Sequence, residues 1–312
     1  MNPTRRDFLS SLSLLGVAGL AGPILSASEA AAKPAPKGGL RIAHLTDIHM
    51  CDRPVAFEGM AKVLAAVKAS GAVAVVNTGD SFMELNGRTL AEAESHWAAW
   101  RKAFAGFDIP VHSCLGNHDV WTPPKGDVAN HQGHLGLAQE GKAGALTLLG
   151  MPAPYYAVRI GKWRFLMCDS MGGRRYSFGE QQLAWIESQL SELGDGEHAA
   201  LCFHVPIQSP GAWMYMVNHQ PSEKWGFPYG DLQRDLKEVT QLLRRFPRAR
   251  AVLTGHIHYV DQVDYLGVRH LNSGAVSGNW WKGVLDNDFP PAFGLVDFHL
   301  DGTVERQMVS PI

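Results

Sequence analysis

Short apolar runs alternate in the first part of the chain with longer stretches whose apolar positions recur at helical spacing. Five of the short runs are flanked by glycine or polar residues, a pattern typical of buried strands. They are Leu40–Leu45, Val73–Asn77, Val111–Leu115, Ala199–Phe203 and Ala251–Leu253. Helices are predicted between the first three, at Val55–Ala69 and Leu90–Phe107. This strand, helix, strand order predicts an α/β fold.

Further strands are predicted in the second half of the chain. Trp163–Cys168 and Val268–Leu271 are short apolar runs of the same kind. Near the end, Phe293–His299 and Thr303–Met308 lie on either side of Asp301-Gly302, which predicts a β-hairpin.

Five polar segments each follow a predicted strand, at its carboxyl end. They are Asp47-Ile48-His49, Gly79-Asp80, Gly116-Asn117-His118-Asp119, His204 and Gly255-His256-Ile257-His258. In open α/β sheets, ligands bind at the edge where the strands' carboxyl ends lie. The sequence therefore predicts that these segments meet in one site.

The side chains in these segments offer oxygen and imidazole nitrogen as ligands, without cysteine. Such ligands suit divalent ions such as Zn, Fe and Mn, whereas structural zinc sites favour thiolates. In two-metal sites a single carboxylate can lie between ions about 3.5 to 4 Å apart and bind both. Asp80, which follows a conformationally permissive glycine, is the natural bridging residue.

In their order and in every motif residue, the five segments resemble the calcineurin-like metallophosphoesterase family. The likeness extends over essentially the whole chain from Leu40 onward, and it implies a catalytic domain over residues 40–312. The implied fold is α/β, with two packed mixed β-sheets flanked by helices in a four-layer αββα sandwich. Met83 stands where purple acid phosphatases of this superfamily have an iron-binding tyrosine. The resemblance is therefore closer to the phosphodiesterase-like branches.

The resemblance also implies a role for each motif residue, with two divalent ions (Mn, Fe or Zn) as cofactors. The first ion would be held by Asp47, His49, Asp80 and His258. The second would be held by Asp80, Asn117, His204 and His256. His118 would stay free of metal and face the substrate, and Asp119 would orient its ring through a hydrogen bond.

Charge then favours a small phosphate ester as substrate. The positive charge of two divalent ions exceeds the negative charge of the two ligating aspartates, so the site has a net positive charge that attracts phosphate. A water whose pKa the metals lower towards about 7 would attack phosphorus, with His118 as general acid or transition-state stabiliser. We expect a phosphodiesterase, with cyclic nucleotides among the substrates considered. A phosphomonoesterase or a phospholipase-like hydrolase is the alternative within enzymes. A non-catalytic, metal-bound envelope binding protein is the alternative from another class.

The amino terminus predicts a twin-arginine signal peptide over residues 1–32. Arg5 and Arg6 precede an apolar stretch, residues 12–25, and then small residues, after which 33–39 would be a flexible linker. We therefore expect the twin-arginine export machinery as a partner and a periplasmic or secreted location. The apolar stretch is broken by glycines and Pro23 and falls short of the roughly 20 residues of a membrane span, so no stable span is expected in the mature form.

Composition narrows the remaining classes. The formal net charge is -2, and the basic pair Arg244-Arg245 is typical of a solvated helix end, so no nucleic-acid groove is indicated. None of the four cysteines is part of a Cys-x-x-Cys motif, and three lie in strand-like runs. Buried free thiols are therefore favoured over disulfides.

Two predicted inserts, residues 120–156 and 205–231, follow catalytic motifs and should shape the substrate. Trp213 and Tyr215 in the second insert have two alternative roles. They would stack on a base or a sugar of the substrate, or they would form an apolar cluster packed under the loop. Arg174-Arg175 would be phosphate clamps or solvated loop charges. The pair Trp280-Trp281 would either wall the site or pack the end of the sheet.

Overall fold

Two mixed β-sheets form the centre of the protein, seen in a computed structural model that describes residues 35–124, 138, 140–172, 176–228, 230–283, 285 and 289–312. The first sheet has the order β11-β10-β1-β2-β3. Its strands are β1 (Leu40–Leu45), β2 (Ala74–Asn77), β3 (Val111–Ser113), β10 (Phe293–Phe298) and β11 (Val304–Val309). Strands β1 to β3 are mutually parallel, and the hairpin β10–β11 joins them antiparallel to β1.

The second sheet has the order β4-β5-β6-β7-β9-β8. Its strands are β4 (Tyr156–Ile160), β5 (Trp163–Met167), β6 (His198–Cys202), β7 (Ala249–Thr254), β8 (Val260–Tyr265) and β9 (Val268–Ser273). The four central strands are parallel, and each edge strand is antiparallel to its neighbour.

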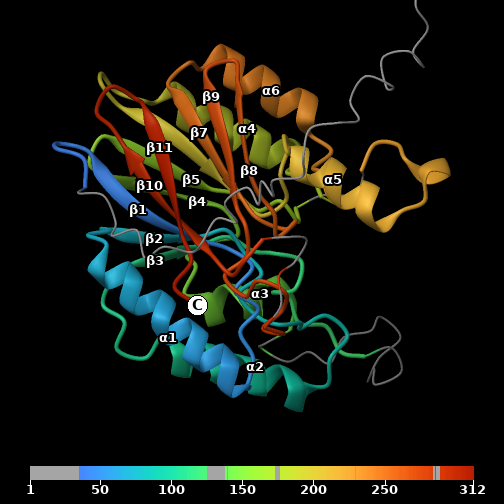
Figure 1. Ribbon diagram of the computed structural model, residues 1–312. Coiled ribbons are helices and arrows are strands. Elements are labelled where there is room, and N and C mark those ends of the chain that lie inside the picture. The colour runs from blue at the N-terminus through green and yellow to red at the C-terminus, as the bar shows by residue number, and fades with distance from the viewer. Residues whose placement is uncertain are drawn as a thin grey trace, which may run out of the picture. The chain divides into compact units, whose positions relative to one another are not determined.

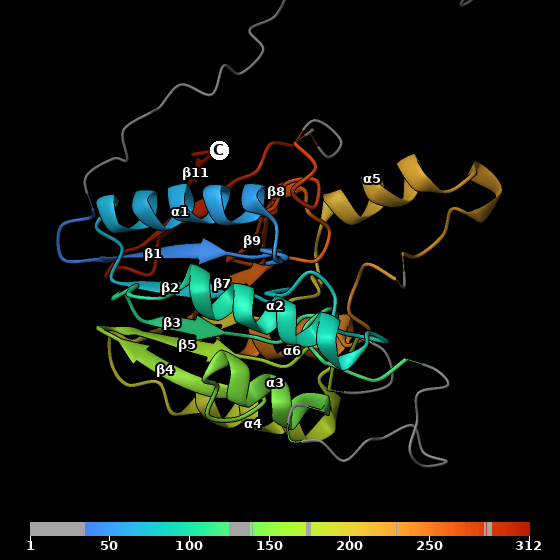
Figure 2. The ribbon, with the colours of Figure 1, turned by 90° about the horizontal axis from the view of Figure 1, so that it is seen from below.

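Helices cover the outer face of each sheet (Figures 1 and 2). The helices are α1 (Pro54–Ala69), α2 (Leu90–Ala103), α3 (Gly141–Leu149), α4 (Gly179–Ser191), α5 (Pro210–His219) and α6 (Leu236–Arg245), with a 3₁₀ turn at Ser222–Lys224. Proline at the first position starts α1, and a capping box between Thr89 and Glu92 starts α2. Among the described helices, none has the length and apolar character of a membrane span.

Three apolar clusters fill the spaces between four layers. Met60 and Val63 of α1 pack on Leu45 and Val75 of the first sheet. Between the sheets, Ile42 and Val296 are in the same cluster as Phe165 and Leu253. A third cluster joins α4 and α6 to the outer face of the second sheet, through residues such as Ile186, Val239 and Val252. The four-layer αββα fold is therefore confirmed.

The predicted elements of the first sheet are close to those observed, with small differences at their ends. The strand predicted at 111–115 ends at Ser113, and the helix predicted at 90–107 ends at Ala103. The two predicted inserts are not plain loops, because α3 lies in the first and α5 in the second. All four cysteines are buried and free, as predicted. Residues 1–34, which include the predicted signal peptide, lie outside the described residues.

Candidate metal centre

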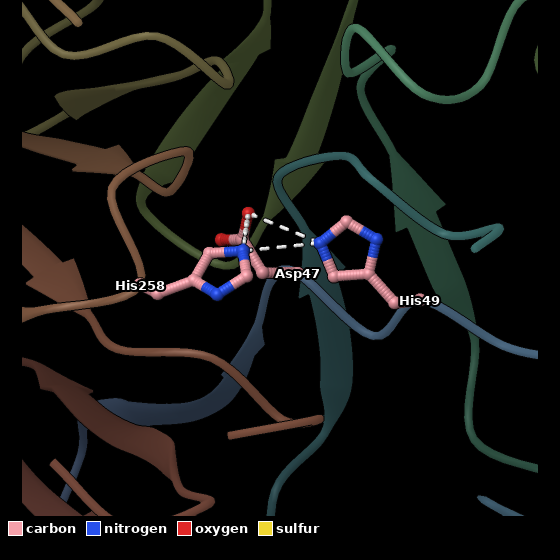
Figure 3. A group of neighbouring side chains, drawn as sticks. All are labelled: Asp47, His49 and His258. Carbon is pink, nitrogen blue, oxygen red and sulfur yellow. Dashed lines mark hydrogen bonds and ion pairs between the residues drawn. The ribbon is translucent and has the colours of Figure 1, made fainter. Parts of the chain in front are cut away.

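Segments that follow β1, β2, β3, β6 and β7 converge at one edge of the two sheets. The side chains that gather there form two groups, and within each group the candidate ligand atoms lie within 4.8 Å of one another. The first group is Asp47, His49 and His258 (Figure 3), and the second is Asp80, His204 and His256. Six of the seven predicted metal ligands are therefore brought together, although they come from distant parts of the sequence.

In the first group, both imidazoles point towards the aspartate (Figure 3). Nε2 of His258 lies 3.4 Å from Oδ1 of Asp47, and Nε2 of His49 lies 4.0 Å from the same oxygen. The two Nε2 atoms are 3.1 Å apart. Three electron-rich atoms thus face a common point, an arrangement in which a cation offsets their mutual repulsion.

Asp80 lies between the two groups. Its Oδ2 is 3.2 Å from Nε2 of His204 and 3.8 Å from Nε2 of His49. The seventh predicted ligand, Asn117, joins the second group because its Oδ1 lies 3.1 Å from Nε2 of His204. Since one carboxylate oxygen reaches both groups, the position of Asp80 suits a bridging ligand.

The backbone at the candidate ligands is unusual. Asp47, His49, Asp80, His256 and His258 all have positive φ angles, between 46° and 77°. Residues other than glycine seldom adopt this left-handed region, and strained conformations of this kind cluster at functional sites. In two of the motifs, alternate residues reach the metal groups, while Ile48 and Ile257 between them pack in apolar clusters.

Glycines in the motifs allow the loops to approach one another closely. A Cβ atom on Gly116 would lie 2.1 Å from Oδ1 of Asp80, and one on Gly255 would lie 1.8 Å from Oγ1 of Thr46. No side chain fits at either position without displacing a neighbour. The Gly-Asn and Gly-His pairs of the motifs are therefore explained by packing between loops.

Hydrogen bonds fix the rings of the second group. Nδ1 of His204 lies 2.9 Å from the carbonyl oxygen of Thr78, and Nε2 of His256 lies 3.0 Å from that of Gly230. A carbonyl oxygen can only accept, so these nitrogens carry the hydrogens. In the neutral rings, the lone pairs are then on Nε2 of His204 and Nδ1 of His256, as metal binding requires.

The charges of the site favour a cation. Burial raises the pKa of Asp47, but His258 beside it lowers that pKa, with a net value of about 2. Burial lowers the pKa of His49 to about 3 and that of His256 to about 4, so both rings are neutral near pH 7. For His204, burial lowers the pKa but Asp80 raises it, with a net value of about 9. A metal ion entering this group would compete with that proton.

These residues fit two divalent ions. The donors are carboxylate, amide and imidazole atoms without sulfur, which suits Zn, Fe or Mn. Low pKa values keep Asp47 and Asp80 anionic and the rings of His49 and His256 neutral near pH 7, whereas His204 would release its proton on binding a metal.

His118 lies beside the metal groups and has a carboxylate on each side. Its Nε2 is 3.9 Å from Oδ2 of Asp80, and its Nδ1 is 3.0 Å from Oε2 of Glu84. Burial lowers the pKa of His118, whereas Asp80 and Glu84 raise it, and the net change is upward. The side chain remains 19% exposed. The ring is therefore accessible to a substrate, and its neighbours favour the protonated form.

The prediction that Asp119 orients the ring of His118 is wrong. Oδ1 of Asp119 accepts from the backbone N–H groups of Ser81 and Phe82, and Oδ2 accepts from that of Gly116. Asp119 is fully buried and ties the loop after β2 to the loop after β3. Neighbouring residues in a tight turn point their side chains in different directions, and here Glu84 takes the place beside the ring.

The two tryptophans of the late segment have different positions. Trp280 is half-buried, and its ring centroid lies 3.8 Å from that of His49 and 5.1 Å from that of His118. Trp281 is buried in the core with α1, and its Nε1 donates to the carbonyl oxygens of Ile48 and His49. Of the two open alternatives, Trp280 walls the site and Trp281 packs the sheet end.

Trp213 and Tyr215, two other residues singled out in the sequence, are not members of either group. Trp213, on α5, is 44% exposed. Tyr215 packs against the small cluster around Ile257 and Tyr259, which matches the structural alternative for this residue. Arg174 and Arg175 lie outside the described residues.

Glu84 and Gly230 contact histidines of the site, His118 and His256, and the sequence did not reveal these contacts. Each lies in an irregular segment, and each acts through a single interaction with a distant histidine. No local pattern marks such a residue. Glu84 reaches His118 because the backbone N–H of Leu85 donates to the carbonyl of His118, 3.0 Å away.

Comparisons with known proteins agree with this geometry. A family model described as calcineurin-like phosphoesterase matches residues 40–260. The 3',5'-cyclic adenosine monophosphate phosphodiesterase CpdA of Escherichia coli K12 is 24% identical over 240 residues, which cover 75% of this chain and 73% of that protein.

Two solved structures have a similar fold. A dimetal phosphatase from Danio rerio has a TM-score of 0.58 at 14% identity and covers 88% of this chain and 99% of its own. GAP50, described as the anchor in the inner membrane complex of Plasmodium, has a TM-score of 0.57 at 16% identity and covers 88% of this chain and 85% of its own. At these identities the likeness establishes the fold alone.

Proposed function

The chain belongs to the calcineurin-like phosphoesterase family, and on this basis we propose that it is a dinuclear-metal phosphodiesterase that acts outside the cytoplasm. The observation that carries the proposal is the position of Asp80, whose Oδ2 lies within 4 Å of a histidine from each metal group. Beside it, His118 provides a partly exposed proton donor. Together these features suit hydrolysis of a phosphate ester.

The residues that would hold the ions are those of the two groups. Asp47, His49, Asp80 and His258 would bind the first ion; Asp80, Asn117, His204 and His256 would bind the second. When bound, such ions supply Lewis-acid chemistry, which polarises the phosphoryl group and lowers the pKa of water.

His118 would serve the leaving group. Asp80 and Glu84 favour its protonated form, so its ring can stabilise charge that develops on the ester oxygen or donate a proton to the departing alkoxide. Glu84, on the Nδ1 side of the ring, leaves Nε2 directed towards Asp80 and the metal groups. General acid catalysis of this kind typically contributes about 10² to 10⁴ in rate.

A diester is favoured as substrate because of the similarity to CpdA, a relative named for hydrolysis of cyclic adenosine monophosphate. A phosphomonoesterase or a phospholipase-like hydrolase is the alternative, since the same donors suit either. The discriminating experiment compares bis-p-nitrophenyl phosphate, p-nitrophenyl phosphate and cyclic AMP as substrates, with and without added Mn. We expect the diesters to be hydrolysed with the higher kcat/KM, and a preference for the monoester would overturn the assignment.

The second candidate function, a metal-bound envelope binding protein without turnover, is favoured by one comparison. GAP50 has a similar fold and is described as an anchor in the inner membrane complex, and a shared fold does not by itself determine function. If protein shown to contain two metals per chain hydrolyses no member of the panel, the binding role is supported instead. The presence of His118 beside the metal groups argues for the enzyme.

Export is proposed from the predicted signal peptide. Replacing Arg5 and Arg6 with Lys should retain the precursor inside the cell, because twin-arginine leaders depend on that pair. Fractionation of cells that express either form would measure it. Equal export of the two forms would contradict a twin-arginine route.

A further inference from the structure

His49 differs from the histidines of the second metal group in how its ring is held. Its Nε2 faces Asp47 and His258, but its Nδ1 is buried and has no hydrogen-bond partner among the described residues. His204 and His256, by contrast, each donate their second ring hydrogen to a backbone carbonyl. Metal-binding histidines almost always have such a partner, because it fixes the orientation of the ring.

An aromatic ring takes this place at His49. The indole of Trp280 lies against the imidazole, with centroids 3.8 Å apart and an angle of 34° between the planes. The same indole lies 5.1 Å from the rings of His258 and His118, at 42° and 66°. Trp280 therefore contacts two imidazoles of the first metal group as well as the proposed proton donor.

The backbone at Trp280 is held in an unfavourable conformation. Trp280 and Trp281 have φ angles of 54° and 58°, which bulky residues rarely adopt. Two interactions with the first motif region stabilise it, since Arg53 donates to the carbonyl of Trp280 at 2.7 Å and Trp281 donates to the carbonyl of His49 at 3.0 Å. Such strain persists where the surrounding structure fixes it, often at a functional site.

We propose that Trp280 is a positioning residue for the first metal ion, and that its indole holds the His49 imidazole by stacking in place of the usual hydrogen bond. Trp281 complements it by holding the backbone of the same histidine. The inference rests on the proposed dinuclear site. It adds a requirement for an aromatic ring at position 280, which a site built only from ligands and hydrogen bonds would not have.

The test measures metal binding by titration calorimetry: metal-stripped protein is titrated with Mn²⁺ in the absence of substrate. Trp280→Ala should lower the affinity for one of the two ions by about 10- to 100-fold, which is the usual effect of losing a group that orients a ligand. Trp280→Phe keeps a ring that can stack and should recover most of the affinity. Trp213→Ala, which removes an exposed tryptophan on α5, is the matched control and should bind both ions normally.

His49→Ala identifies which binding event belongs to the first ion, and thermal unfolding of the metal-free variants checks that each is folded. Unchanged binding of both ions by Trp280→Ala would overturn the proposal. Equal weakening in Trp280→Phe and Trp280→Ala would overturn it as well, because a ring would then not suffice. Since no substrate is involved, a protein with this binding pattern but no hydrolysis would contradict the proposed function and leave the role of Trp280 standing.

Discussion

The two halves of the metal centre hold their imidazoles by different means. In the second half, backbone carbonyls of Thr78 and Gly230 accept from His204 and His256. In the first half, His49 has no such acceptor and lies against the ring of Trp280. A carbonyl is present whatever the residue type, whereas stacking needs an aromatic side chain. Metal binding by the first half should therefore be more sensitive than metal binding by the second to substitutions of neighbouring residues.

The strongest test replaces the residue that the two halves share. Asp80→Ala removes the carboxylate oxygen that lies 3.8 Å from His49 and 3.2 Å from His204. Metal content should fall from about two ions per chain to about one or none, and turnover should fall to background. Elemental analysis alongside kinetics measures both, with the surface variant Asp195→Ala as control. If Asp80→Ala still contained two ions per chain, neither half would need the Asp80 carboxylate to bind its metal.

His118→Ala separates catalysis from metal binding. Because His118 is placed as proton donor and not among the candidate ligands, turnover should fall by roughly two orders of magnitude while both ions remain. His299→Ala, at the far end of β10, is the control and should retain normal turnover. Normal turnover of the His118 variant would remove its proposed role.

Gly59→Ala tests the first half from a distance. A Cβ on this buried residue of α1 would lie 2.3 Å from Cζ3 of Trp281, so the indole must move. Alanine ordinarily stabilises a helix by up to about 1 kcal/mol relative to glycine. Here overpacking should instead lower the free energy of unfolding by about 1 to 3 kcal/mol.

Urea unfolding and Mn²⁺ titration measure the two consequences of Gly59→Ala. The first ion should bind less tightly, because Trp281 also holds the backbone of His49, while the second should be unaffected. Gly194→Ala is a suitable control, since its added Cβ would meet its nearest neighbour at an ordinary 3.5 Å. A gain in stability at Gly59→Ala would mean that the core adapts without loss.

The last test concerns His44, a buried residue of β1. Its ring nitrogens contact the hydroxyls of Thr78, at 2.9 Å, and Ser273, at 2.8 Å. Burial lowers its pKa from 6.5 to about 3, with Arg306 also lowering it and Asp47 opposing. The folded protein therefore binds this proton less readily than the unfolded chain. The stability that His44 contributes is complete above pH 6.5 and is lost as the pH falls towards 3.

For this group alone the loss approaches about 1.4 kcal/mol per pH unit within that window. The slope of the unfolding free energy against pH, measured by urea unfolding, gives the number of protons taken up on unfolding. Between about pH 4 and pH 6 this number should be larger by up to one for the wild type than for His44→Asn. His112→Asn, in the edge strand β3, serves as the comparison: burial lowers the pKa of His112 in the same direction, but its side chain is only half-buried, so a smaller change in slope is expected. Identical slopes for wild type and His44→Asn would mean that His44 titrates normally in the folded protein.

Much of the first sheet could be predicted because its signals are local. The runs at Leu40–Leu45 and Val73–Asn77 are apolar and bounded by polar motifs, so pattern and strand coincide to within one residue. The edge strands β4 and β8 were missed because, unlike the central strands, they have no buried position and so do not form a continuous apolar run. Helices α3 and α5 were also missed, since glycine and proline recur in the inserts that contain them.

The candidate ligands were predictable for a similar reason, because each motif is short and contiguous. Asp119 was misassigned since sequence adjacency does not fix the direction of a side chain, and its carboxylate binds backbone N–H groups of two loops. Glu84 was missed because its contact with His118 depends on how two loops pair.

The sequence by itself determined the family, the strand rhythm and the set of oxygen and imidazole donors, because these depend on residue type and spacing along the chain. Only the tertiary structure decided which groups face which. It placed Asp80 between the halves, Glu84 beside His118, and Trp280 against His49 while Trp281 is buried. The reason is that these contacts join loops more than 30 residues apart, and their geometry is set by packing of the whole sandwich.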